Sequence, residues 1–306
     1  MQGYALSADG FLSREFQSPE LLGEDVRVRV EYACLETDSA LDDVCPGGGL
    51  VGVVVECGEA ATAFQDARVL VPQVSACGEC DTCRRGAATV CPSRRVLGRD
   101  QHGGCAETVV CSGRWLTRVD ELITLEGPMA ALAAGPALRA YALFCKAGVA
   151  AGEVVIVLGT GATAEILALL ATSRGAKLAR GVGETSAEAI AKQLSEQGCT
   201  DRPQKLFVVE GESNLELAIQ IAHPSSVITT AIGVGNLDLQ TLFDRELSLL
   251  SLSYGHPDLL PETAALIVKG ELDLGAILSE AVLGPESFEQ SRQAQSDGKC
   301  LVVHRA

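Results

Sequence analysis

The distribution of apolar and polar positions divides the chain into two halves with different textures. In the first half, residues 26–32 (VRVRVEY) alternate apolar and polar side chains, as a strand with one buried face does. Residues 50–55, 68–71 and 106–111 form short apolar runs separated by glycine and proline, which is typical of further strands. The pattern therefore predicts an irregular, mostly antiparallel β domain up to about residue 118.

The second half alternates apolar strands with helical stretches. An alanine-rich helix is predicted over residues 127–149, followed by the apolar strand 153–158. The later pattern predicts helices at 165–173 and 186–196 and strands at 177–179, 206–209 and 226–232. Alternation of this kind predicts an α/β fold with a doubly wound parallel sheet.

The ends of the parallel-sheet region define the expected domain boundaries. The pattern of apolar and polar residues changes near residue 122. A strand-like pattern returns from about residue 266 and continues to the C-terminal run 300–304. We therefore expect a β domain over 1–120, the parallel-sheet domain over 121–265, and a return of the chain to the first domain over 266–306.

Composition and charge limit the classes of partner. The 306 residues include 40 acidic and 24 basic side chains, a net charge of −16, which repels nucleic acid and anionic lipid. No apolar run approaches the roughly 20 residues that span a bilayer, and the N-terminus lacks the features of a signal peptide. We expect a cytoplasmic protein with no nucleic-acid or membrane partner, whose 12 cysteines are thiols or metal ligands.

Four of these cysteines have the spacing of a metal site. Cys77, Cys80, Cys83 and Cys91 follow the pattern C-x2-C-x2-C-x7-C. Four thiolates this close in sequence can surround one zinc ion tetrahedrally, and a site with no open position is structural. The pattern thus predicts one structural zinc ion in a lobe over 75–95; an iron–sulfur cluster and ordinary thiols or disulfides are the alternatives.

A glycine turn between a predicted strand and helix resembles a dinucleotide-binding fingerprint. Gly159, Gly161 and Ala164 form G-x-G-x-x-A, in which the glycines allow a tight turn and close approach of a pyrophosphate. Glu165 follows at once and would repel that group unless it points away. No Asp lies near residue 182, where a ribose-binding acid is expected, and Arg180 could instead meet the 2′-phosphate of NADP. The alternative is a domain of this fold kept for structure or dimerisation.

The cysteine segment resembles the structural-zinc lobe of zinc-type medium-chain dehydrogenase/reductases, the alcohol dehydrogenase superfamily. Other similar stretches are 52–58, Asp66-Ala67-Arg68-Val69, Gly103-Gly104-Cys105-Ala106-Glu107, Ala140-Tyr141 and the last strand, 299–303. The resemblance spans nearly the whole chain. It implies a GroES-like β domain followed by a Rossmann domain.

The same resemblance implies where an open catalytic zinc site would lie. Its ligand positions correspond here to Gly48 or Gly49, to Leu35 or Glu36, and to the neighbourhood of Gly135. Each expected ligand position is thus empty or altered. A rearranged site would draw on Cys34, Glu36, Asp38 and Cys45.

Three functions remain open from the sequence. The first is an NAD(P)H-dependent oxidoreductase that acts without catalytic zinc on a small carbonyl, quinone or enone. The second is a non-catalytic scaffold or binding subunit that joins a partner protein, and the third is an alcohol dehydrogenase with a rearranged zinc site. A homodimer is expected because the apolar stretch 247–252 falls where family members pair their sheets edge to edge; an ordinary buried strand is the alternative.

Overall fold

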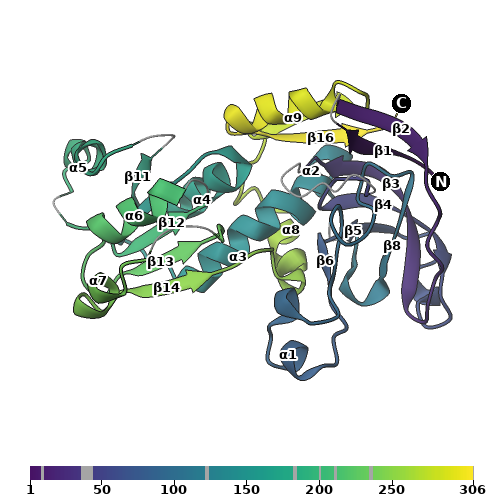
Figure 1. Cartoon of the computed structure of the whole chain (residues 1–306), viewed down its shortest axis with the longest axis horizontal. Helices are drawn as coiled ribbons and strands as arrows, with labels where there is room; N and C mark the ends of the chain where they lie inside the picture. The colour runs from purple at the N-terminus through teal and green to yellow at the C-terminus, as the bar shows by residue number, and fades with distance from the viewer. Residues whose placement is uncertain are drawn as a thin grey trace. The chain divides into compact units, whose positions relative to one another are not determined.

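The computed structural model describes residues 1–7, 10–35, 44–120, 124–181, 185–199, 201–209, 212–233 and 237–305. The chain forms two compact units (Figure 1). The first unit is Met1–Leu138 with Gly255–Ala306, and the second is Arg139–Tyr254. These divisions differ from the expected boundaries, because residues 124–138 and 255–265 belong to the first unit.

A seven-stranded sheet forms the core of the first unit in the described residues. Its order is β15 (Leu278–Val282), β16 (Cys300–His304), β3 (Asp25–Cys34), β4 (Leu50–Cys57), β5 (Arg68–Val71) and β9 (Thr117–Arg118), with β8 (Thr108–Ser112) also paired to β3. All pairs are antiparallel except β15 with β16. The strands are rich in valine, and side chains such as those of Val28, Val54 and Val69 are fully buried. The predicted antiparallel β domain is therefore confirmed.

Smaller elements complete the first unit. Strands β1 (Gln2–Ser7) and β2 (Gly10–Glu15) pair with each other, and β6 (Val74–Ser75) pairs with β7 (Arg95–Val96) at the base of the cysteine lobe. The lobe carries the one-turn helix α1 (Asp81–Arg84). The remaining helices are α2 (Gly127–Leu132), α8 (Leu260–Val268) and α9 (Ser287–Ser296), and 3-10 turns lie at Thr62–Phe64, Ala88–Val90, Gly113–Trp115 and Pro257–Leu259.

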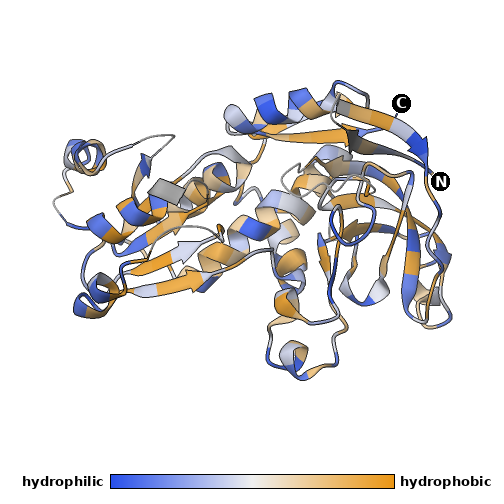
Figure 2. Cartoon of the chain, viewed as in Figure 1, coloured by the Kyte–Doolittle hydropathy of each residue, from blue (hydrophilic) through white to orange (hydrophobic). Residues whose placement is uncertain are grey.

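The second unit is built on a five-stranded parallel sheet in the described residues. Its order is β11 (Lys177–Gly181), β10 (Val154–Leu158), β12 (Lys205–Val208), β13 (Val227–Thr230) and β14 (Ser248–Ser251). The helices are α3 (Leu138–Ala147), α4 (Gly161–Ser173), α5 (Ala187–Glu196), α6 (Glu212–Ile221) and α7 (Leu239–Asp244). Every residue of β10 is buried, as expected for the centre of a parallel sheet. Figure 2 shows hydrophobic positions, in orange, along the neighbouring strands β13 and β14. The predicted doubly wound parallel sheet is confirmed.

One long apolar helical segment corrects an expectation from the sequence. The run Gly127–Ala147 has 21 residues and is long and apolar enough to cross a membrane by length and composition. However, 78% of its most apolar window is buried inside the protein, which is the behaviour of a core helix. The run bends at Gly135, whose φ of −104° and ψ of −113° are not helical, next to Pro136.

The strand order of the second unit indicates where a ligand is expected to bind. After β10 the chain passes to β11 on one side, and it then returns to β12 on the other side. The order therefore reverses between β10 and β12, and open parallel sheets bind ligands outside the carboxyl ends of the strands at such a point. A six-stranded dinucleotide-binding sheet has one more strand outside its second strand. The described residues between β11 and β12 contain no such strand, so β11 is an edge.

Gln193 of α5 and Gln197, the C-cap residue of that helix, cover the free edge of β11. Gln193 Oε1 accepts the backbone N–H of Arg180 at 2.9 Å, and Gln193 Nε2 donates to the Arg180 carbonyl at 2.7 Å. Gln197 Nε2 donates to the Leu178 carbonyl at 2.6 Å. Because a side-chain amide carries one donor group and one acceptor, Gln193 pairs with β11 as a neighbouring strand would. The edge is thereby protected from pairing with another chain.

Substituting Gln193 by Ala is expected to lower the free energy of unfolding by about 1–3 kcal/mol, because two backbone groups of β11 lose their partner. Urea denaturation measures this change. Lys192→Ala, on the same helix, is the control because its side chain is 79% exposed. Equal stability of the two variants would contradict the edge-covering role.

Candidate functional site

The four cysteines of the lobe converge on one point. Their sulfur atoms are 3.9 Å apart for Cys77 and Cys83, 3.5 Å for Cys80 and Cys83, 3.8 Å for Cys80 and Cys91, and 3.6 Å for Cys91 and Cys77. Four sulfurs placed tetrahedrally about 2.3 Å from a zinc ion would be about 3.8 Å apart. The donor set therefore fits zinc. All four are free thiols in this structure, so the disulfide alternative does not apply.

Backbone N–H groups of the lobe favour the thiolate form of two of the four cysteines, Cys77 and Cys80. The N–H groups of Glu79 and Cys80 point at the Cys77 sulfur and lower the pKa of that thiol to about 6. The N–H of Cys83 donates to Cys80 Sγ at 3.5 Å and lowers the Cys80 pKa as well. Hydrogen bonds to the charged form favour a thiolate, which is the form that binds metal.

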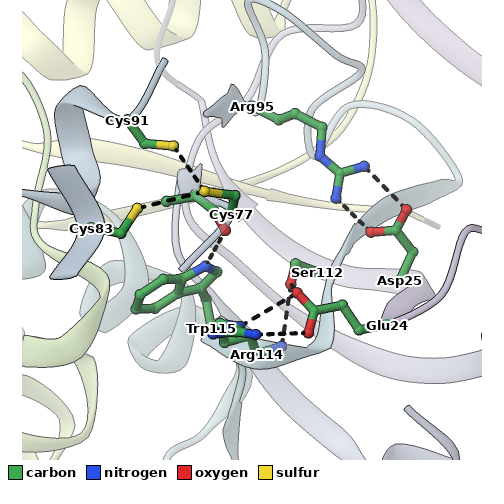
Figure 3. Close-up of polar contacts among 10 residues, drawn as sticks. Glu24, Asp25, Cys77, Cys83, Cys91, Arg95, Ser112, Arg114 and Trp115 are labelled. Carbon is green, nitrogen blue, oxygen red and sulfur yellow. Dashed lines mark hydrogen bonds and ion pairs between the residues drawn. The ribbon is translucent and has the colours of Figure 1, made fainter. Parts of the chain in front are cut away.

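Polar contacts tie the lobe to the main sheet. Trp115 Nε1 donates to the Ala76 carbonyl at 2.7 Å, and the Arg95 guanidinium binds the carboxylate of Asp25, at the start of β3, at 2.5 Å (Figure 3). Asp25 is almost fully buried, so this pair is a firm anchor. The lobe's own apolar cluster is small; it consists of Ala76, Ala88 and Cys91, with Trp115 and the other three cysteines packed against it. Such a lobe needs a metal ion to be stable.

The predicted dinucleotide turn lies at the reversal point of the parallel sheet. Gly159 and Gly161 have φ angles of 120° and 83°, which side chains rarely adopt, and Ala164 is fully buried against the sheet. Helix α4 begins at Gly161, and its N-cap residue Thr160 makes no side-chain cap hydrogen bond. Backbone N–H groups of the first turn can therefore meet an anion at the positive end of the helix. The residues fit a pyrophosphate.

Glu165 is held by Arg180. The guanidinium Nη1 and Nη2 donate to Glu165 Oε2 and Oε1 at 2.6 and 2.7 Å, a bidentate pair. The sequence analysis treated the two residues separately, with Glu165 as a charge that would repel a pyrophosphate and Arg180 as a partner for a 2′-phosphate. In the structure they bind each other. Residues 182–184, where a ribose-binding acid was sought, lie outside the described residues.

Main-chain atoms fill the position where a catalytic zinc ligand was sought. A Cβ on Gly49 would lie 2.2 Å from the carbonyl carbon and oxygen of Ala134 and 2.3 Å from the nitrogen of Gly135. A Cβ on Gly47 would lie 2.8 Å from the nitrogen of Gly104. The expected ligand positions Gly49 and Gly135 are thus brought together, but as backbone packed on backbone. A ligand side chain cannot be accommodated at Gly49.

The residues considered for a rearranged zinc site do not form one in the described residues. Cys34 Sγ donates to the Ala131 carbonyl at 3.2 Å, and burial raises the pKa of Cys45 to about 12. Glu36 and Asp38 lie outside the described residues. The lobe cysteines are the one group of three or more His, Cys, Asp or Glu side chains found close enough to share a metal in the described chain.

The four histidines make local contacts. His102 Nδ1 accepts the backbone N–H of Cys45 at 3.2 Å, and burial, aided by Arg14, lowers the His102 pKa. The other three contact carbonyl or carboxylate oxygens: His223 at Pro224, His256 at Gly86 and Asp258, and His304 at Glu280. These contacts explain the histidines without a metal.

Comparison with known proteins agrees with the fold. Residues 21–121 match the alcohol dehydrogenase GroES-like domain family. An alcohol dehydrogenase of Geobacillus stearothermophilus is 29% identical over 59% of this chain and 57% of its own length. The D-arabitol-phosphate dehydrogenase of Enterococcus avium is 22% identical over 92% of this chain and 90% of its own. The chain is therefore similar to alcohol dehydrogenases, and its residues 21–121 match the GroES-like domain of that family.

Solved dehydrogenase structures share the fold over nearly the full length of this chain. The alcohol dehydrogenase RspB of Escherichia coli CFT073, solved with NADH, has a TM-score of 0.82 at 18% identity and covers 99% of both chains. A zinc-binding dehydrogenase of Sinorhizobium meliloti 1021, solved with NADP, has a TM-score of 0.76 at 19% identity and covers 99% of this chain and 98% of its own. This chain covers little more than half the length of the Geobacillus stearothermophilus alcohol dehydrogenase. It covers almost all of each of these two solved structures.

Substituting Cys83 by Ser is expected to reduce bound zinc from about one ion per chain to nearly none and to lower Tm, because the lobe loses a ligand. Zinc is counted by mass spectrometry on the purified protein, and Tm by calorimetry. Cys145→Ser is the control, because Cys145 is exposed and outside the lobe. Unchanged zinc content and Tm in Cys83→Ser would contradict the metal site.

Substituting Gly49 by Ala is expected to lower the free energy of unfolding by about 1–3 kcal/mol, because the new Cβ meets backbone atoms that cannot move aside cheaply. Gly233→Ala is the control, since a Cβ there meets nothing within 4 Å. If urea denaturation finds both variants equally stable, the close packing at Gly49 is wrong.

Proposed function

We propose that this protein is an NAD(P)H-dependent oxidoreductase that acts without a catalytic zinc on a small carbonyl, quinone or enone. The observation that carries the proposal is the turn at Gly159 and Gly161, which stands at the start of α4 and at the reversal point of the sheet. Fold alone does not determine activity, so the argument rests on this site.

The chain's own residues would bind and orient the cofactor. N–H groups at the start of α4 would bind the pyrophosphate, Gly159 and Gly161 would let it approach the backbone, and Ala164 would keep the helix close to the sheet. Arg180, at the end of β11, would lie on the side of the adenosine ribose. When bound, the nicotinamide supplies or accepts hydride.

The names of similar proteins support this class of reaction. They include dehydrogenases solved with NADH and with NADP, and an enzyme named for D-arabitol phosphate. The lobe cysteines would hold one structural zinc ion that takes no part in hydride transfer, because four protein ligands leave no open position.

The packing at Gly49 supports a reaction without a Lewis-acid metal. With main-chain atoms at that position, a substrate carbonyl would be polarised by hydrogen bonds or would need to be electron-poor already. Small quinones and enones meet this requirement, because conjugation makes the carbon that receives hydride electrophilic.

We further propose a cytoplasmic homodimer that pairs through the edge strand β14, whose residues are exposed or half-buried.

A non-catalytic scaffold is the second candidate. It is favoured by the same packing at Gly49, by the absence of a strand outside β11 in the described residues, and by the carboxylate of Glu165 near the start of α4. Nucleotide binding separates the two candidates.

Titration of the purified protein with NADH and NADPH, followed by nucleotide fluorescence, is expected to give micromolar binding with about one zinc ion per chain. Gly161→Asp should abolish that binding because it adds bulk and negative charge at the pyrophosphate. Gly175→Asp is the matched control, since Gly175 also has positive φ but a Cβ there meets nothing within 4 Å. Absence of binding at millimolar nucleotide would favour the scaffold, and two zinc ions per chain would favour a metal-dependent alcohol dehydrogenase.

A further inference from the structure

The Glu165–Arg180 pair is held more firmly than an ordinary surface ion pair. Both guanidinium Nη atoms donate to the two carboxylate oxygens at 2.6 and 2.7 Å, and the Arg180 and Glu165 side chains are only 22% and 36% exposed. The backbone of Arg180 is fixed in addition by both amide atoms of Gln193. Arg180 is therefore restrained at its main chain and at its side chain.

The pair connects the two segments that a dinucleotide would contact, the first turns of α4 and the end of β11. Glu165 is the fifth residue of α4, one turn from the glycines proposed to bind the pyrophosphate. Arg180 is the last residue but one of β11, and in dinucleotide-binding sheets the end of the second strand meets the adenosine ribose. A 2′-phosphate on that ribose distinguishes NADP from NAD.

The charges of the pair cancel, and each residue alone would act in the opposite direction. A free guanidinium would attract a 2′-phosphate, which carries a charge of about −1.5 to −2 at neutral pH. A free carboxylate would repel both the 2′-phosphate and the pyrophosphate. In the bidentate pair, Arg180 neutralises Glu165, and Glu165 accepts a hydrogen bond from each Nη of Arg180, the paired geometry with which a guanidinium also binds a phosphate.

We propose that Glu165 is a specificity-determining residue, which keeps Arg180 from a 2′-phosphate so that the protein prefers NADH to NADPH. This inference rests on the proposed dinucleotide site. The sequence expectation that Arg180 meets a 2′-phosphate thus depends on Glu165, because both Nη atoms of Arg180 already donate to the Glu165 carboxylate.

The proposal predicts opposite effects for the two members of the pair. Glu165→Gln should release Arg180 and raise the affinity for NADPH about tenfold, with little change for NADH. Arg180→Gln should leave Glu165 unpaired near the pyrophosphate and weaken both nucleotides. The double variant should recover NADH binding without gaining NADPH binding.

Dissociation constants of NADH and NADPH, measured by titration calorimetry, test these predictions on the full chain. Glu196→Gln is the control, because Glu196 is a 65% exposed residue of α5 whose contact with Lys192 is long, at 3.9 Å. Thermal denaturation of each variant verifies that it is folded, and Glu165→Gln alone decides the question should Arg180→Gln fail to fold.

A wild-type preference for NADPH overturns the proposal, and so does NADH binding with an unchanged NADPH to NADH ratio in Glu165→Gln. Either of these results leaves the proposed function intact. If neither nucleotide binds to the wild type or to any variant, the proposed dinucleotide site and this inference both fail.

Discussion

Close packing of main chain on main chain at Gly49 is the main structural constraint on the region where the family resemblance implies a catalytic zinc. The residue lies against the peptide that joins Ala134 to Gly135, at a distance that leaves no room for a side chain. Gly135 is itself the point where the long helical segment bends. The backbone fold brings together the positions at which the family resemblance implies zinc ligands, but supplies no ligand side chain at Gly49 or Gly135. Among the described residues, the group of side chains close enough to share a metal ion lies in the cysteine lobe.

The second unit has five described strands where a six-stranded dinucleotide-binding sheet has one more, and a side chain makes hydrogen bonds at the edge that this leaves open. The strand expected outside β11 is absent from the described residues, and Gln193 supplies the hydrogen bonds that it would have made. The same stretch of β11 carries Arg180, which neutralises the acid next to the glycine turn. One short edge strand therefore supports both the integrity of the sheet and the charge balance of the proposed cofactor site.

Local patterns predicted much of this architecture. Alternation of apolar and polar residues located β3, short apolar runs located β4 and β5, and the strand–glycine–helix succession located β10 and α4. The predicted helix began at residue 165, whereas α4 begins at Gly161, because glycine has a low helix propensity and its role here is set by the turn. The cysteine spacing predicted the convergence of four sulfurs, since ligands so close in sequence have few other arrangements.

Contacts between distant residues could not be predicted in this way. Gln193 and Gln197 have the pattern of a solvated helix face, so their bonds to β11 carry no local signal. Opposite charges at 165 and 180 were visible in the sequence, but the bidentate geometry depends on how α4 packs on the sheet. Likewise, the glycines at 47–49 indicated the loss of ligands, but not that another backbone segment fills the space.

The most direct test of a nucleotide-dependent activity without catalytic zinc is a crystal structure of the protein grown with NADH, with anomalous diffraction recorded at the zinc edge. Our account predicts the pyrophosphate at Gly159 and Gly161 and one anomalous peak, among Cys77, Cys80, Cys83 and Cys91. A second zinc peak beside residues 34–49, or a nucleotide bound elsewhere, would contradict it.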